Sequence, residues 1–259
     1  MRITNRNGKI VLLSLFLTLA CAGAASADLV ARSPGLSPTN GFPLWYQDQV
    51  LASGGVRLSL CLVNNPALCQ FDPVDPLNRW SRTTGFGTEA FYFQARGSIP
   101  ADGGRTAAGV SADIDMRVSA TYEGAVARGN QIAQNFIDIL VQGLRPGSGP
   151  YLIVWPFGQR RVNADRRGEI NIRVGPRILN ALDFDTALGG PVGPYLKAVN
   201  PAPPRGFLGN PNILQTVTGS PTRRNFFSIT APANVDIGGT VRPNVIRTSQ
   251  FRVQGRITR

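Results

Sequence analysis

The stretch from Val110 to Tyr122 constrains the fold most strongly, because apolar and polar residues alternate along it without a break. The residues at even positions are apolar or small, and those between them are Ser, Asp, Arg and Thr. Period-two alternation over 13 residues is typical of a β-strand with one buried and one solvated face. It therefore predicts an antiparallel sheet.

Shorter segments of the same character predict further strands. They cover residues 45–52, 57–63, 89–96, 151–155, 159–163, 169–174, 225–230 and 249–257. Residues 132–144 also fit a helical stripe, but their β-branched content favours a strand. The strands at 159–163 and 169–174 are predicted to pair as a hairpin around Asp165–Gly168. The fold class expected is all-β, an antiparallel β-sandwich of immunoglobulin-like or jelly-roll-like type with long Pro/Gly-rich loops.

Residues 175–224 differ in composition from the rest of the chain. This segment contains eight prolines, at positions 176, 191, 194, 201, 203, 204, 211 and 221. Little regular structure is expected there, apart from short helical turns near 178–182 and 186–188. The segment is too apolar for a disordered linker, so we expect an ordered excursion packed on the sheet. Residues 28–175 are then predicted to form the sandwich domain, with 176–259 either completing it or forming a small second β domain.

Residues 1–27 have the pattern of a signal peptide. A basic start is followed by an apolar run from Ile10 to Ala20 and by the small residues Ala25-Ser26-Ala27. Cleavage after Ala27 would give an exported chain that begins at Asp28. A lipid anchor on Cys21 is the alternative, although Thr18 stands where lipoprotein processing favours a Leu-like residue. No second apolar run is long enough to span a membrane as a helix.

Removal of Cys21 leaves Cys61 and Cys69, and an even number of cysteines in an exported protein predicts a disulfide. Cys61 lies in the second strand, residues 57–63, of a predicted hairpin with its turn at Ser53–Gly55, and the bond would tie the next loop to that strand. Histidine is absent from the chain. This excludes Ser-His-Asp and Cys-His catalysis and the histidine zinc motifs. Carboxylate-pair glycosidases need no histidine, so an enzyme is disfavoured rather than excluded. No cofactor is predicted.

The chain is basic, with a formal net charge of +12 that falls to +9 without Arg2, Arg6 and Lys9 of the predicted signal peptide. The arginines are spread along the sequence instead of forming a block. That distribution favours a solvated sheet face, with attraction to an anionic surface polysaccharide or an acidic partner as the alternative. Nucleic acid is not an expected partner.

Two carboxylate pairs are candidates for chemistry. Asp113 and Asp115 lie on the polar face of the long strand, about 7 Å apart along the backbone. They could bind calcium, act as acid and base, or pair with arginines such as Arg117. Asp183 and Asp185 lie in the loop-rich segment and are weak calcium candidates.

Trp80 lies in an irregular stretch near Asn78, Arg79 and Arg82. Such a loop could stack on a sugar or bind an anion, and these four residues are the predicted ligand-binding candidates. The alternative is that Trp80 packs the loop on the sheet.

Several segments together resemble a group of exported bacterial proteins of uncharacterised function. They are GFPLWYQD, RLSLCLVNNPALC, EAFYFQA, PGSGPYLIVWPFG, FLGNPNILQTVTGSPTRRNFFSI and FRVQGRI. The resemblance covers most of the mature chain and implies a β-rich fold and a surface or extracellular location. It transfers no catalytic residue. The segment PGSGPYLIVWPFG is also similar to strand entries of immunoglobulin-like sandwiches.

The function expected from these features is that of an exported, non-enzymatic protein of the cell surface or extracellular space, acting by self-assembly or adhesion. Contacts with further copies of the chain would use strand edges or the Pro-rich excursion. The alternatives are a carbohydrate-binding module of the envelope, using Trp80, or a carboxylate-dependent hydrolase built on Asp113 and Asp115 or on Asp183.

Overall fold

The computed structural model describes residues 29–49, 55–101, 109–176 and 179–259. The predicted signal peptide, Cys21 and most of the predicted turn at Ser53–Gly55 lie outside these residues. The elements are β1 (Leu29–Arg32), β2 (Tyr46–Asp48), β3 (Arg57–Ser59), α1 (Arg79–Thr84), β4 (Ala90–Ile99), β5 (Ser111–Tyr122), β6 (Gln131–Gln142), β7 (Tyr151–Trp155), β8 (Gly158–Val162), β9 (Ile170–Val174), β10 (Lys197–Asn200), β11 (Gln215–Thr218), β12 (Phe227–Thr230), β13 (Val245–Thr248) and β14 (Gln250–Thr258).

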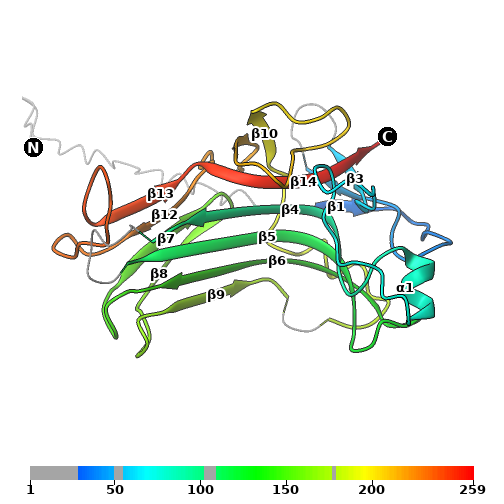
Figure 1. Cartoon of the computed structure of the whole chain (residues 1–259), viewed down its shortest axis with the longest axis horizontal. Coiled ribbons are helices and arrows are strands. Elements are labelled where there is room, and N and C mark those ends of the chain that lie inside the picture. Colours follow the sequence, from blue (N-terminus) through cyan, green and yellow to red (C-terminus); the bar gives the residue numbers. More distant parts are fainter. Residues whose placement is uncertain (1–28, 50–54, 102–108, 177–178) are drawn as a thin grey trace, which may run out of the picture.

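The described strands form two antiparallel sheets (Figure 1). The large sheet has ten strands, in the order β1-β2-β3-β14-β4-β5-β6-β9, with β11 also paired to β14 and β10 paired to β11. The small sheet has four strands, in the order β13-β12-β7-β8. The C-terminal part of the chain therefore contributes strands to both sheets. The predicted all-β antiparallel fold is confirmed.

Strands β4, β5 and β6 are the long central strands of the large sheet. Strand β5 pairs with β6 along its whole length, from Ser111 opposite Gln142 to Tyr122 opposite Gln131. The predicted apolar face of β5 is buried throughout, and its polar face looks outward. Residues 132–144, which fitted both a helix and a strand, form most of β6, because alternate side chains (Ile137, Ile139 and Val141) pack in the core next to β5.

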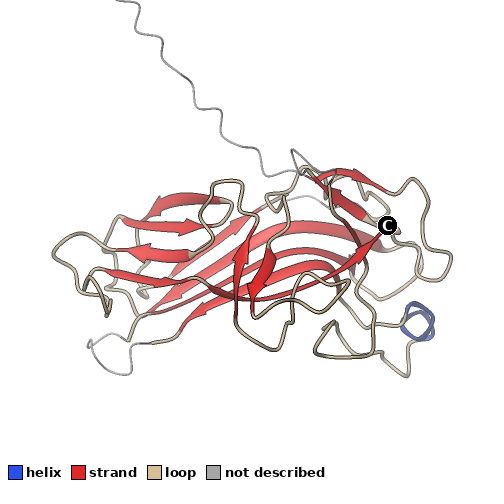
Figure 2. Cartoon of the chain, turned by 90° about the horizontal axis from the view of Figure 1, so that it is seen from above, coloured by secondary structure: helices blue, strands red, loops and turns tan. Residues whose placement is uncertain are grey.

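The small sheet packs against the inner face of the large one. Strand β7 buries Tyr151, Ile153 and Trp155, and these side chains share one apolar core with the inner face of β5. Figures 1 and 2 show the small sheet at one end of the molecule and α1 at the other. Two sheets around one core give the molecule a sandwich-like arrangement. The choice between immunoglobulin-like and jelly-roll order stays a prediction.

The predicted hairpin of β8 with β9 is wrong. Its turn exists, since the Asp165 amide donates to the Glu169 carbonyl at 2.8 Å. The strands on either side nevertheless diverge into different sheets, because β8 pairs with β7 and β9 pairs with β6. The turn at Pro156 and Phe157 makes β8 the antiparallel neighbour of β7. A local turn signal thus identified the bend but not the partner strands.

The Pro-rich excursion is ordered and contains two strands that the sequence did not predict, β10 and β11. The described parts of the predicted helical turns near 178–182 and 186–188 are turns without helix. Asn135 of β6 holds this segment on the sheet. Its side chain donates to the carbonyls of Ala187 and Val192 at 2.9 and 3.1 Å, and accepts from the Val192 amide at 2.9 Å. Gly190 packs so closely on Asn135 that a Cβ there would lie 2.2 Å from it.

Cys61 and Cys69 form the predicted disulfide. The second predicted strand of that region, residues 57–63, is regular only over β3. Both half-cystines are buried, with exposed fractions of 0% and 3%. The bond therefore fixes the loop of residues 62–68 where it leaves the large sheet.

Loss of this disulfide should have a moderate effect on stability. The closed loop is short, so the double variant Cys61→Ala/Cys69→Ala should unfold with about 2–3 kcal/mol less free energy in urea than the oxidised protein. Wild-type protein measured in dithiothreitol serves as the control and should lose a similar amount. Equal stability of oxidised and reduced wild type would contradict the prediction.

Candidate binding groove on the large sheet

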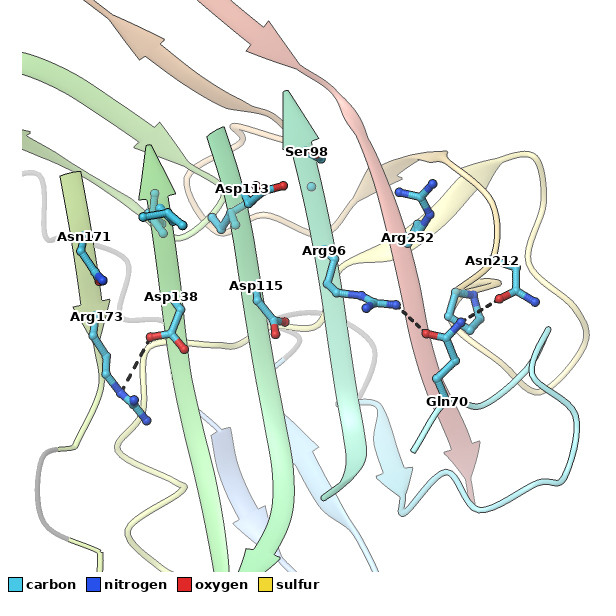
Figure 3. A pocket seen from close by; sticks show the side chains of 15 residues that line it. Gln70, Arg96, Ser98, Asp113, Asp115, Asp138, Asn171, Arg173, Asn212 and Arg252 are labelled. Atoms are coloured by element: carbon cyan, nitrogen blue, oxygen red, sulfur yellow. Dashed lines mark hydrogen bonds and ion pairs between the residues drawn. The ribbon is translucent and has the colours of Figure 1, made fainter. Parts of the chain in front are cut away.

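A row of five charged residues crosses the outer face of the large sheet. The strand registers place Arg252 of β14 beside Arg96 of β4, and Arg96 beside Asp115 of β5. Asp115 stands beside Asp138 of β6, and Asp138 beside Arg173 of β9. Neighbouring strands are about 4.8 Å apart, so each charge has the next one directly at its side. Figure 3 shows these side chains on one face of five adjacent strands.

This row lies in a groove of about 780 Å³. The groove is lined by Gln70, Arg96, Gly97, Ser98, Asp113, Ile114, Asp115, Asp138, Ile139, Leu140, Asn171, Arg173, Pro211, Asn212 and Arg252. Gln70 and Asn212 form one wall, where the Gln70 side chain donates to Asn212 at 2.7 Å and accepts from Arg96 (Figure 3). Buried Gln254 anchors this wall, since its side chain bonds both the amide and the carbonyl of Gln70.

Arg117 lies in the next row and organises the carboxylates. Its guanidinium forms ion pairs with Asp115, with Asp138 at 3.3 Å and with Glu89 at 3.4 Å. The same guanidinium lies 4.2 Å from the ring centre of Phe136, and Arg173 stacks on that ring at 4.1 Å. Arg117 is largely buried, with 19% of its side chain exposed. It is therefore the counter-ion of a partly desolvated cluster rather than a surface charge.

Burial raises the pKa of two carboxyl groups in this cluster. Desolvation raises the pKa of Asp115, and the charge and hydrogen bond of Arg117 oppose that rise. Desolvation likewise raises the pKa of Glu89, again opposed by Arg117. Both groups bind a proton more readily when the protein is folded. Their contribution to stability is therefore largest below the unfolded-state pKa and falls as the pH rises through the folded-state pKa.

Arg252 and Asp113 line the groove but take no part in the ion-pair cluster around Arg117. Neither side chain has an ion pair or a hydrogen bond within the described residues. Asp113 is exposed and Arg252 is half-buried. They are accordingly available to a ligand, whereas Asp115 is held by Arg117 and by the Gln94 amide at 3.1 Å.

The candidate pair of Asp113 and Asp115 thus lies on one outward face, as predicted, but its two members differ. The sequence did not indicate Asp138, Arg96, Arg173 or Arg252 as site residues. Alternation did place Arg96 and Arg252 on outward faces. What it could not supply was the register that aligns them, because register is set by contacts between strands distant in sequence.

The Trp80 candidates belong to a different part of the fold. The stretch expected to be irregular contains the short helix α1. Asn78 is its N-cap, accepting from the Ser81 amide at 3.0 Å and donating to the Val126 carbonyl at 2.9 Å. Arg82 donates to the Pro76 carbonyl at 2.6 Å, and Trp80 packs against the core. Asn78, Arg79 and Trp80 line a shallow pocket of about 610 Å³, whereas Arg82 is not among its lining residues.

The calcium candidates also have protein partners. Asp183 accepts from the Thr186 hydroxyl at 2.7 Å and from the Asp185 amide at 3.0 Å, and these donors lower its pKa. Asp185 pairs with Arg32, with hydrogen bonds of 2.5 and 3.2 Å. Within the described ranges no group of three or more His, Cys, Asp or Glu side chains is arranged to hold a metal ion.

Comparisons with protein-family models, with curated proteins and with solved structures returned no match to this chain. Across the part of the chain that the structure covers, no helix is long and apolar enough to cross a membrane. The geometry of the groove is therefore the main indication of function in this chain.

Proposed function

We propose that this chain is an exported, non-catalytic protein that acts by adhesion, and that the groove on the large sheet binds an anionic polysaccharide. The N-terminal pattern typical of a signal peptide supports export. The disulfide supports an oxidising compartment. The ligand class follows from the charges in the groove.

The pair formed by Arg252 and Arg96 carries this proposal. Their guanidinium groups stand on adjacent strands at one end of the charged row, and no carboxylate pairs with Arg252 in the described structure. A guanidinium fits a planar carboxylate with two parallel hydrogen bonds. Ser98, Asn171 and Asn212 add groups that can bond sugar hydroxyls. An open polar groove of this kind suits a carboxylated saccharide chain that binds along the surface of the sheet.

The carboxylates of the groove support binding more than hydrolysis. A glycosidase of the usual kind needs one carboxyl group to give a proton and another to act as base or nucleophile. Asp115 and Asp138 share Arg117 as a counter-ion, and Asp115 also accepts a hydrogen bond from the Gln94 amide. Both carboxylates are therefore already held by protein partners, which supports a structural role over that of a catalytic acid or nucleophile.

Self-assembly through strand edges is less well supported. Edge strand β8 carries exposed Arg160 and Arg161, and charged edge strands resist pairing with another chain. Edge strand β9 is only five residues long, with Asn171 and Arg173 exposed. Adhesion through the groove on the large sheet would require no unpaired strand edge.

The proposal predicts opposite effects for two substitutions at the groove. Arg252→Gln should weaken binding of a soluble polyuronate about three- to tenfold, or about 0.7–1.4 kcal/mol, the usual net contribution of one hydrogen bond. Asp113→Asn should strengthen binding or leave it unchanged, because it removes repulsion between like charges. Isothermal titration calorimetry of residues 28–259 with the polyuronate at low and at physiological salt measures both.

Arg145→Gln is the matched control, since it removes the same charge from an exposed site in the turn after β6. It should leave the affinity unchanged, and neutral dextran should not bind any of the proteins. Weaker binding in Asp113→Asn would contradict an anion site and favour a bridging cation. Equal losses in the Arg252 and Arg145 variants would show attraction by net charge alone.

A further inference from the structure

A second groove lies on the outer face of the small sheet, away from the charged row. It has a volume of about 1140 Å³ and runs over β7, β12 and β13. The chain between β12 and β13, residues 238–242, forms one side of it. Figure 1 shows this connection at the end of the molecule opposite α1.

The floor of this groove combines apolar and polar side chains, because Leu152 and Val154 of β7 lie beside Thr230 and Ser228 of β12. Strand β7 is apolar on both faces, and Leu152 and Val154 point outward into the groove while Tyr151, Ile153 and Trp155 fill the core. Period-two alternation would place polar residues at those two outward positions. Val245 and Phe226 extend the apolar lining.

Three arginines stand around this floor, namely Arg224, Arg242 and Arg247. No Asp or Glu is among the described residues that line the groove, and none of the three arginines has an ion pair there. Arg224 donates to the neutral Gln159 side chain at 2.7 Å, and Arg247 stacks on Phe226 at 3.7 Å. The groove therefore combines apolar surface with uncompensated positive charge.

The connection beside the groove is held in a defined shape. The Ile237 and Gly239 amides both donate to the Pro243 carbonyl, at 2.8 and 3.2 Å. A Cβ at Gly239 would lie 1.9 Å from the Arg242 carbonyl oxygen, so this close approach requires glycine. The turn presents Arg242 and Val241, and Val241 is 93% exposed. Exposed Val241 beside Arg242 therefore adds a further apolar group next to a positive charge at the edge of the groove.

We propose that this groove binds a free single-chain amphiphile with an anionic head group. The acyl chain would lie on Leu152 and Val154, and the head group would bond Arg247 and Arg224. A bilayer is the less suitable occupant, because Val154 is only 8% exposed and Leu152 is half-buried, so a flat membrane surface would contact little of either side chain. This inference is independent of the polysaccharide site, since the two grooves share no residue.

The test is calorimetric titration of residues 28–259 with dodecyl phosphate below its micelle concentration. Inorganic phosphate and dodecyl maltoside, also below its micelle concentration, are titrated separately. Dodecyl phosphate should bind at least tenfold more tightly than either of them, because inorganic phosphate lacks the apolar chain and dodecyl maltoside lacks the anionic head group. The double variant Arg224→Gln/Arg247→Gln should lose at least tenfold in affinity, and Leu152→Asn should lose severalfold.

Arg145→Gln is the control and should bind dodecyl phosphate as the wild type does. Equal affinity for dodecyl maltoside would overturn the proposal by showing a merely apolar surface. Equal affinity for inorganic phosphate would overturn it by showing an anion site without a chain. Sedimentation with anionic phospholipid vesicles, combined with no binding of dodecyl phosphate, would overturn it in favour of membrane contact.

Discussion

Replacing Arg117 by methionine should lower the free energy of unfolding by about 3–5 kcal/mol, the range found when one partner of a buried ion pair is removed. Arg117 is the shared counter-ion of Asp115, Asp138 and Glu89. Methionine keeps much of the side-chain length but leaves Asp115 and Glu89 without an ion-pair partner among the described residues. Asp138 keeps only Arg173, at 3.8 Å. The Phe136 ring would also lose one of its two stacked guanidinium groups. Urea unfolding followed by tryptophan fluorescence measures the change.

The pH dependence of this loss in unfolding free energy distinguishes the ionic contribution of Arg117 from its packing contribution. Because burial already raises the pKa of Asp115 and of Glu89, removal of Arg117 should raise both further. Protonation relieves the repulsion, so the loss should be smaller at pH 4 than at pH 7. The control is Arg173→Gln, whose side chain is 59% exposed and which should cost less than about 1 kcal/mol. An Arg117→Met loss that is equal at both pH values would contradict the ionic account.

Replacing Asn135 by alanine should cost about 3–5 kcal/mol, because each buried polar group that loses its partner costs about 1–3 kcal/mol. Asn135 is fully buried. Its amide is the partner of three backbone groups, namely the Ala187 carbonyl and both the carbonyl and the amide of Val192. A methyl group supplies none of these hydrogen bonds. Residues 187–192 should then separate from the sheet, with faster amide hydrogen exchange in that segment.

The matched control is Gln134→Ala, the neighbour of Asn135 on β6. Gln134 faces the opposite side of the sheet and is half-buried, so its truncation should change stability by less than about 1 kcal/mol. Hydrogen exchange at 187–192 should stay at the wild-type rate in this control. A loss below about 1 kcal/mol in Asn135→Ala would show that proline content, rather than this amide, fixes the excursion.

Local patterns identified most of the core strands. The alternation from Val110 to Tyr122 predicted β5 and its buried face, and the apolar run from Tyr151 to Trp155 predicted β7. Both patterns are strong because a strand side chain has only two directions in which to point. The short strands β1, β10, β11 and β13 were missed. At four residues each, they are too short for alternation to stand out.

The candidate sites show where such patterns stop being informative. Asn78 and Trp80 were predicted as ligand-binding candidates because they share an irregular, proline-flanked stretch. Asn78 caps α1, a role that Asn is well suited to because its side-chain oxygen can accept from a first-turn amide. For the charged row no local signal existed. Arg96 and Arg252 are 156 positions apart, and only the pairing of β4 with β14 makes them neighbours.

The sequence by itself determined the all-β class, the buried face of the long strand, the disulfide and the exclusion of histidine chemistry. These properties depend on residue type and on a two-residue period, which act within one strand or turn. The tertiary structure alone decided that β8 and β9 separate, that β14 lies between β3 and β4, and that five charges align across one face. Strand register and sheet order depend on which distant segments bury the most apolar surface together, and no local pattern contains that information.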